Sequence, residues 1–176
     1  SLPTANALTT INGDATPSDL PIKKTSSIWY LKESSNVTGN FTVETSGKWY
    51  MIGNTSDGIN YADITLNVGG DCYINNSIVA VGHNGDSTTP SVAALNVNGD
   101  LYISGTGSVL HLASIGDHGH YSTAAGSLNL QGTMYIGSGA RLGNAGSNVT
   151  SSFFINNLEN SGHVFFESTA SGTINN

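Results

Sequence analysis

A nine-residue phrase recurs five times along this chain of 176 residues, and it constrains the fold more than any other feature. Its most regular copy, Leu95–Ile103, reads Leu-Asn-Val-Asn-Gly-Asp-Leu-Tyr-Ile. Successive copies begin 23, 29, 33 and 30 residues apart. Such spacing is typical of repeat proteins, whose units bury their apolar faces only by stacking on one another. The copies span Val43–Met51, Leu66–Ile74, Leu95–Ile103, Leu128–Ile136 and Leu158–Phe166.

Within the phrase, apolar and polar residues alternate with the period of two that places them on opposite faces of a β-strand. A glycine occupies the centre of every copy, on the apolar face, where the missing side chain allows the chain to bend. No ten-residue stretch shows the three-and-four spacing of an amphipathic helix. We therefore predict an all-β fold, a β-solenoid (β-helix) of about five coils. A β-sandwich is the alternative, but that fold does not require one phrase to repeat with the same inward and outward positions.

The first 27 residues contain three of the four prolines and no copy of the phrase. We expect an irregular N-terminal arm or cap over 1–27, followed by a single solenoid domain of five repeats over 28–176. The chain opens at Ser1 without Met or a leader-like apolar segment, which we interpret as a mature, processed product.

Charged residues make up 10% of the chain, well below the ~25% usual in soluble proteins, and Asn, Ser, Thr and Gly supply the polar surface. The net charge of −7, from 12 acidic and 5 basic residues, leaves no basic stripe, so we expect no nucleic-acid partner. No apolar run approaches the ~18 residues that cross a bilayer, so we expect no membrane span.

Five Asn-x-Ser/Thr sequons are candidate glycosylation sites of an exported protein. Asparagine is also a favoured turn residue, so unmodified turns are the alternative. The sequons are at Asn36, Asn40, Asn54, Asn75 and Asn148.

If coils stack about 4.8 Å apart, equivalent residues form ladders along the stack. The outward aromatic position of the phrase then gives an aromatic ladder, which would rigidify the coils or present a surface to sugar rings or another subunit. Its members are Tyr50, Tyr73, Tyr102, Tyr135 and Phe165.

Asp71 and Asp100 would lie on adjacent coils, where paired carboxylates repel unless a cation such as calcium lies between them. Solvated carboxylates that lean apart are the alternative. His118 and His120 could face one metal, but zinc requires further ligands that the neighbouring sequence lacks. We predict no metal site and no cofactor, with Asp71, Asp100, His118 and His120 as the candidate ligands and calcium as the candidate ion.

The β-solenoid enzymes that cut acidic polysaccharides depend on clustered acids and bases. Here Lys48 and Arg141 stand alone among the coils, because the other three lysines lie at the N-terminal side. We therefore predict that the chain is not an enzyme.

The single cysteine, Cys72, falls on the apolar face of the phrase, which favours a buried, inert thiol. An intermolecular disulfide is the alternative, since an unpaired cysteine in an exported protein can link subunits.

Residues 168–176 contain no charge, proline or helical pattern that would cover the last strand edge. An open edge pairs with the opposite edge of another copy, and a head-to-tail contact that does not close produces a fibre, ring or tube. We therefore predict a non-catalytic structural protein that forms a homopolymer through open strand edges. The predicted assembly-edge residues are Phe165, Phe166 and Ile174.

The Leu-Asn-Val/Leu-x-Gly-Asp/Thr-x-Tyr-Ile phrase resembles the coils of extracellular β-solenoids in microbial surface-layer and adhesin-like proteins, over roughly residues 40–170. A short chain built of little else is more similar to subunits of the tubular sheaths of methanogenic archaea. The resemblance implies a sheath, surface layer or filament at the cell surface, with itself and other cell-envelope components as partners. Those sheaths are associated with disulfide cross-links, which Cys72 could form only between subunits. The alternative is an adhesin or fibre segment that binds glycans through its aromatic ladder and long turns.

Overall fold

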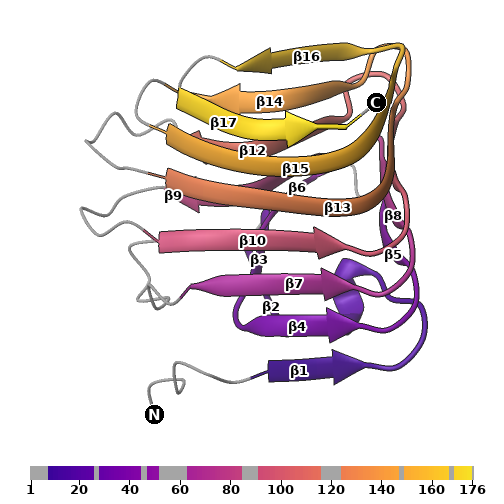
Figure 1. Cartoon of the computed structure of the whole chain (residues 1–176). Helices are drawn as coiled ribbons and strands as arrows, with labels where there is room; N and C mark the ends of the chain where they lie inside the picture. Colours follow the sequence, from indigo (N-terminus) through magenta and orange to yellow (C-terminus); the bar gives the residue numbers. More distant parts are fainter. Residues whose placement is uncertain are drawn as a thin grey trace.

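The computed structural model describes residues 8–25, 28–44, 47–51, 63–84, 91–115, 124–146, 149–166 and 169–175. Within these ranges every regular element is a β-strand except η1 (Pro17–Asp19), a single turn of 3₁₀ helix. Strands pair in parallel with strands of neighbouring turns, apart from the antiparallel pair β2–β3 (Figure 1). The predicted all-β solenoid is confirmed, because a β-sandwich would be built from antiparallel strands.

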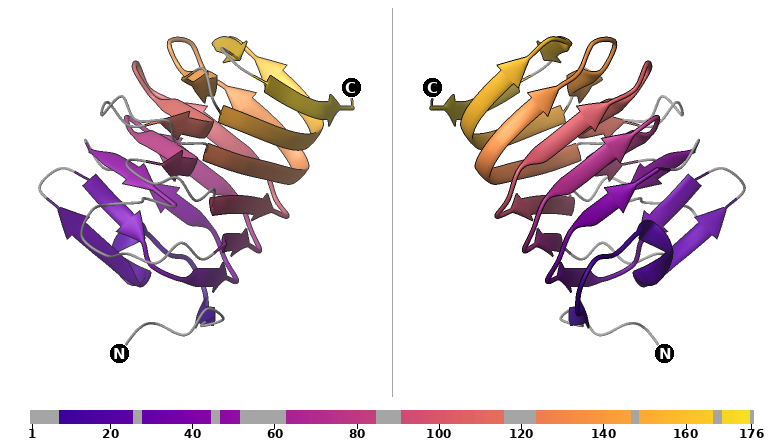
Figure 2. Two further views of the ribbon diagram at one scale, coloured as in Figure 1. Left: turned by 90° about the vertical axis from the view of Figure 1, so that its left-hand side faces the viewer. Right: turned by 90° about the vertical axis from the view of Figure 1, so that its right-hand side faces the viewer.

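Each turn of the solenoid crosses three faces in the same order, and the strands of a face lie one above another (Figure 2). Face 1 contains β1 (Leu8–Ile11), β4 (Ser34–Val37), β7 (Ile64–Val68), β10 (Ser91–Val97), the first halves of β13 (Ala124–Ile136) and β15 (Val149–Asn160), and β17 (Thr169–Ile174). Face 2 contains β5 (Phe41–Val43), β8 (Cys72–Asn75), β11 (Leu101–Ser104) and the second halves of β13 and β15. Face 3 contains β2 (Ile22–Thr25), β3 (Ile28–Leu31), β6 (Lys48–Tyr50), β9 (Ile78–Asn84), β12 (Val109–Ile115), β14 (Arg141–Ala145) and β16 (His163–Phe166).

The solenoid begins earlier than the sequence predicts. β1 pairs with β4 and β3 pairs with β6, so β1 and β3 form the lowest turn. Between them, η1 and β2 form an insertion over residues 16–25. β2 pairs with the edge of β3 that faces away from β6. The predicted arm over 1–27 is therefore too long among the described residues. The segment Thr9–Ala15 lacks the leucine and tyrosine of the phrase, but it keeps the alternation and the Gly-Asp bend.

The three central copies of the phrase stack as predicted. Leu66, Leu95 and Leu128 are direct partners on face 1. On face 2 the partners are Tyr73, Tyr102 and Tyr135. The unequal spacing between copies therefore leaves their register intact, because the added residues lie between the paired segments.

The first predicted copy, Val43–Met51, is out of register. Val43 pairs with Ile74 and Ser35 pairs with Leu66, so the copy directly below Leu66–Ile74 is Ser35–Val43. β6 belongs to face 3 instead, which places Tyr50 there. A serine in place of the leading leucine conceals this copy in the sequence.

The last predicted copy, Leu158–Phe166, is also out of register. Leu158 pairs with Met134, and the partner of Leu128 is Phe153. A register shift after Leu130 shortens this copy and removes its central glycine. Phe165 consequently lies on face 3, in β16.

Inward side chains from all three faces form one continuous core, which includes Leu66, Leu95, Leu101 and Leu110. The bend between faces 1 and 2 lies at the predicted glycine. A Cβ on Gly99 would overlap the Asp71 Oδ1 atom and lie 2.7 Å from the carbonyl carbon of Gly70. Only glycine therefore allows successive bends to stack this closely.

The two ends of the stack differ. At the N-terminal end, Ala15 and Leu20 are buried, and the partly buried Ile11, Ile22 and Trp29 pack against the core. At the C-terminal end the core closes only with side chains that remain partly exposed, and no described element lies beyond β16 and β17. These side chains are Phe153, Leu158, Val164 and Phe166.

Candidate functional site

The C-terminal end of the solenoid is the first candidate site. β17 pairs with β15 on one side, and no described strand pairs with its other edge (Figure 1). Ile174 on β17 is 40% exposed, although its ladder position is buried in the preceding turns, for example at Ile155. The rings of Phe153 and Phe166 stack 5.5 Å apart over the end of the core. Among the described residues, this end therefore presents an apolar surface beside a strand edge that has no pairing strand.

Two of the three predicted assembly-edge residues, Ile174 and Phe166, lie at this open end. The third, Phe165, does not. It alternates with Phe166 along β16 and contacts His111 and His163, with ring centres 6.2 and 5.9 Å away. Phe165 therefore lies on the outer side of face 3, away from the strand edge of β17.

A shallow depression of about 620 Å³ lies beside β16. Its described lining residues include Arg141 and His163 but no carboxylate. The remaining lining residues are Gly139, Ala140, Ser161, Gly162, Phe165 and Phe166.

A ladder of acidic and amide side chains follows the bend between faces 1 and 2, and we call it the corner ladder. Its members are Asp14, Asn40, Asp71 and Asp100. Each Oδ1 atom accepts a hydrogen bond from the backbone N–H of the residue one turn higher, at distances of 2.8, 2.8, 2.8 and 2.7 Å. The last of these donors is Thr133. The corner ladder satisfies backbone groups at a bend where strand pairing is interrupted, so its role is structural.

The second oxygens of two of these carboxylates are also occupied. Tyr73 donates its hydroxyl hydrogen to Asp71 Oδ2 at 3.0 Å, and Tyr102 donates to Asp100 Oδ2 at 3.2 Å. Asp71 and Asp100 are thus held by hydrogen bonds within the protein. Among the residues that the structure describes, no group of three or more His, Cys, Asp or Glu side chains could hold a metal ion. The candidates His118 and His120 lie outside the described residues.

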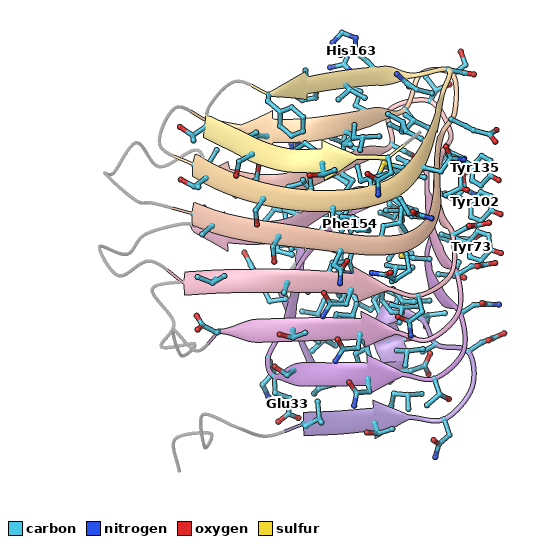
Figure 3. The ribbon with its side chains drawn as sticks, in the orientation of Figure 1. Glu33, Tyr73, Tyr102, Tyr135, Phe154 and His163 are labelled. Atoms are coloured by element: carbon cyan, nitrogen blue, oxygen red, sulfur yellow. The ribbon has the colours of Figure 1, made fainter. Side chains whose placement is uncertain are left out.

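The aromatic ladder contains three of its five predicted members. Tyr73, Tyr102 and Tyr135 project from face 2 one above another (Figure 3). Their ring centres are 5.0 and 4.8 Å apart, and both ring pairs are within 6° of parallel. Tyr50 instead contacts Tyr30 on face 3, and Phe165 is in β16. Because the stacked rings cover one another's faces, the ladder presents mainly ring edges and hydroxyl groups to a ligand.

Burial of the Tyr102 hydroxyl, together with its bond to Asp100, raises the pKa of Tyr102 to about 12. Unfolded tyrosine loses its proton near pH 10. Between about pH 10 and 12 the unfolded chain is deprotonated at this site while the folded chain is not, so the stability contributed by Tyr102 should fall as pH rises through this window. A spectrophotometric titration of the wild type minus that of Tyr102→Phe should show one phenol that titrates near pH 12. Titration near pH 10 would show that the Tyr102 hydroxyl is neither desolvated nor bonded to Asp100 in solution.

Cys72 lies on face 2 between Phe41 and Leu101 and is 2% exposed. Its thiol is free. Burial, with a smaller effect from the Asp71 carboxylate, raises the pKa of Cys72 to about 12. The buried thiol is confirmed, and the predicted alternative of an intermolecular disulfide is inconsistent with this position, because only an exposed thiolate reacts readily.

We expect the folded protein to be inert toward Ellman's reagent at pH 8, since its only thiol is buried and protonated. After unfolding in guanidinium chloride, one thiol per chain should react. Denaturing gels without reductant should show a single monomer band. A dimer band that disappears on reduction would show that Cys72 leaves the core.

Three predicted glycosylation sites lie on described strands or bends, and they remain predictions. Asn36 Oδ1 accepts a hydrogen bond from Asn67 Nδ2 at 2.7 Å on face 1. Asn40 belongs to the corner ladder, and Asn75 ends β8. Asn54 and Asn148 lie outside the described residues.

The corner ladder has two members that sequence reasoning missed, Asp14 and Asn40. Both follow a glycine directly, as Asp71 and Asp100 do. The recurring Gly-Asp or Gly-Asn pair was therefore the signal that could have revealed them.

In the part of the chain that the structure describes, no helix has the length and apolar character to cross a membrane. Comparison with protein-family models, with curated proteins and with solved structures finds no match to this chain.

Proposed function

We propose that this chain is a non-catalytic structural protein that assembles with copies of itself, end to end, into an extracellular sheath, surface layer or filament. The observation that supports this most is the C-terminal end, where an edge of β17 that no described strand pairs borders a partly exposed core. Solenoid proteins that remain monomeric cover such ends with a capping element. A second copy would bury the exposed apolar side chains and pair the open edge of β17.

The N-terminal end supplies a matching edge. β1 pairs with β4 on one side, and no described strand pairs with its other edge. Neither β1 nor β17 contains a charged residue. Contact between these two different ends is heterologous, and such a contact extends indefinitely unless its rotation closes a ring.

The outward ladders support a structural role better than a catalytic one. Asp71 and Asp100 accept hydrogen bonds from both backbone and tyrosine groups, which leaves them poorly placed to transfer protons. The alternative function, a glycan-binding adhesin or fibre segment, would use the aromatic ladder. Its ring faces are covered by one another, so a sugar ring would meet mainly edges.

Electron microscopy and sedimentation of the purified chain test the proposal. We expect filaments, sheets or tubes that pellet, and a pelleted fraction that changes little between about 50 and 500 mM NaCl, because few charges are available for screening. Persistent monomers at high protein concentration would contradict the proposal. Monomers that also bind immobilised glycans would favour the adhesin.

A further inference from the structure

The first and last strands of face 1, β1 and β17, both end in Thr-Ile, and an Asn follows each of them. In the lowest turn they are Thr10, Ile11 and Asn12, and in the highest turn they are Thr173, Ile174 and Asn175. Strand pairing shows that both triplets occupy the same position along face 1, one at each end of the stack. The ladder that connects the two isoleucines runs through Ile11, Val37, Val68, Val97, Leu130, Ile155 and Ile174.

We propose that one copy joins the next by pairing its β17 in parallel with the β1 of its neighbour, in the register that the stack uses throughout. This inference rests on the proposed self-assembly and specifies its interface. Thr173 then lies opposite Thr10, and Ile174 lies opposite Ile11. The partner is a second copy of this chain, and each residue of one triplet pairs with the identical residue of the other.

Backbone hydrogen bonds favour this register. Through the stack, the residue after the buried ladder position donates its N–H to the ladder residue one turn lower. The donors and acceptors are Thr38 to Ile11 at 3.0 Å, Gly69 to Val37 at 2.8 Å, Asn98 to Val68 at 3.0 Å and Asn175 to Ile155 at 3.0 Å.

The two ends of the stack supply the donor and the acceptor of one more such hydrogen bond. Because the N–H and C=O groups of successive residues alternate in direction along a strand, the Ile174 carbonyl oxygen points away from β15 and out of the C-terminal end. By the same alternation, the Asn12 N–H points out of the N-terminal end. In the proposed register, Asn12 of one copy donates to Ile174 of the other, and the pattern continues across the junction.

Side chains at the two ends complement this backbone match. Ile174 is 40% exposed and Ile11 is only partly buried, and contact between them would continue the buried ladder. Asn12 and Asn175 are both exposed and would lie side by side. Stacked amides already bond to each other on face 1, where Asn96 Nδ2 donates to Asn67 Oδ1 at 2.8 Å.

The two ends of the solenoid are also complementary in how far faces 1 and 3 extend. At the C-terminal end, face 1 extends one strand further than face 3, because β17 lies above β15 while β16 is the last strand of face 3. At the N-terminal end the relation is reversed, because β2 lies below β3 while β1 is the first strand of face 1. When β1 sits on β17, β2 therefore occupies the level directly above β16, and it fills the step on face 3.

Disulfide cross-linking between two single-cysteine additions tests the register. Thr10→Cys and Thr173→Cys are mixed in equal amounts before assembly, and the native Cys72 remains in the core. Directly paired residues of neighbouring strands lie about 5 Å apart, within the range that a disulfide spans. We expect oxidation to give a covalent dimer in the mixture and none in either variant alone.

Leu8→Cys mixed with Thr173→Cys is the matched control, since Leu8 lies two residues from Thr10 on the same side of β1. That offset separates the Cα atoms by about 8 Å, which is too far for a disulfide. Filaments without the Thr10–Thr173 cross-link, or with the Leu8 cross-link instead, would overturn the register and leave self-assembly standing. A mixture that forms no filaments under any condition would overturn both.

Discussion

Replacement of Gly126 by alanine should strongly destabilise the upper half of the solenoid. Gly126 lies in β13, where a Cβ would overlap the Leu112 carbonyl oxygen and lie 2.9 Å from the Gly82 nitrogen. These are backbone atoms of face 3, so no side chain can rotate away to make room. We expect the free energy of unfolding to fall by about 3 kcal/mol or more, at the upper end of the penalty for overpacking. Circular dichroism during guanidinium unfolding measures the change.

Gly137→Ala is the matched control. Gly137 follows the same strand, and a Cβ there would lie 3.4 Å from its nearest neighbour, the Ile103 carbonyl oxygen, which is an ordinary contact. We expect a change within roughly 0.5 kcal/mol. Equal losses in the two variants would show that the close approach of β13 to face 3 is absent in solution.

Replacement of Ile174 by lysine should prevent assembly without unfolding the protein. The side chain is 40% exposed in the isolated chain, so an ammonium there is solvated until a second copy covers it. Burying an unpaired charge costs several kcal/mol. We therefore expect the concentration required for assembly to rise by roughly 100-fold or more, since each 1.4 kcal/mol corresponds to a factor of ten. Sedimentation measures the pelleted fraction, and the melting temperature should stay unchanged.

Thr173→Lys is the control for this experiment. Thr173 precedes Ile174 on β17 and faces outward, so its ammonium would remain in water after assembly. We expect near-normal pelleting. If both lysine variants assemble as the wild type does, β17 is not part of the interface.

The central turns could be predicted from the sequence because each retains both the leucine and the tyrosine of the phrase. Direct pairing of Leu66 with Leu95 and of Tyr73 with Tyr102 follows from strand alternation and repetition alone. The same reasoning places Cys72 on the inward side, where the structure finds it.

The terminal turns were harder to predict because their leading residue changes. Ser35 occupies the leucine position of the first copy, and it is buried although polar. Phe153 occupies that position in the last copy, where a register shift also removes the glycine. The closest matches to the phrase in these turns therefore begin at Val43 and Leu158, and this register places Tyr50 and Phe165 in the wrong ladder.

The corner ladder and the matched ends could not be recognised from the sequence without the register. Asp14 is one turn below Asn40 only because residues 16–25 form an insertion between the first two turns. The shared Thr-Ile-Asn triplets are short and common in composition. They become informative when strand pairing shows that both lie at one ladder position, at opposite ends of the stack.

Fibre diffraction, or the power spectrum of electron micrographs, distinguishes end-to-end assembly from every other packing of the solenoid. Seven strands lie one above another on face 1, namely β1, β4, β7, β10, β13, β15 and β17. A filament joined from β17 to β1 should repeat every seven strand spacings, or about 34 Å, with a reflection near 4.8 Å along the filament axis. Filaments whose 4.8 Å reflection lies across the axis, or whose subunit repeat is unrelated to about 34 Å, would rule out the joining of β17 to β1.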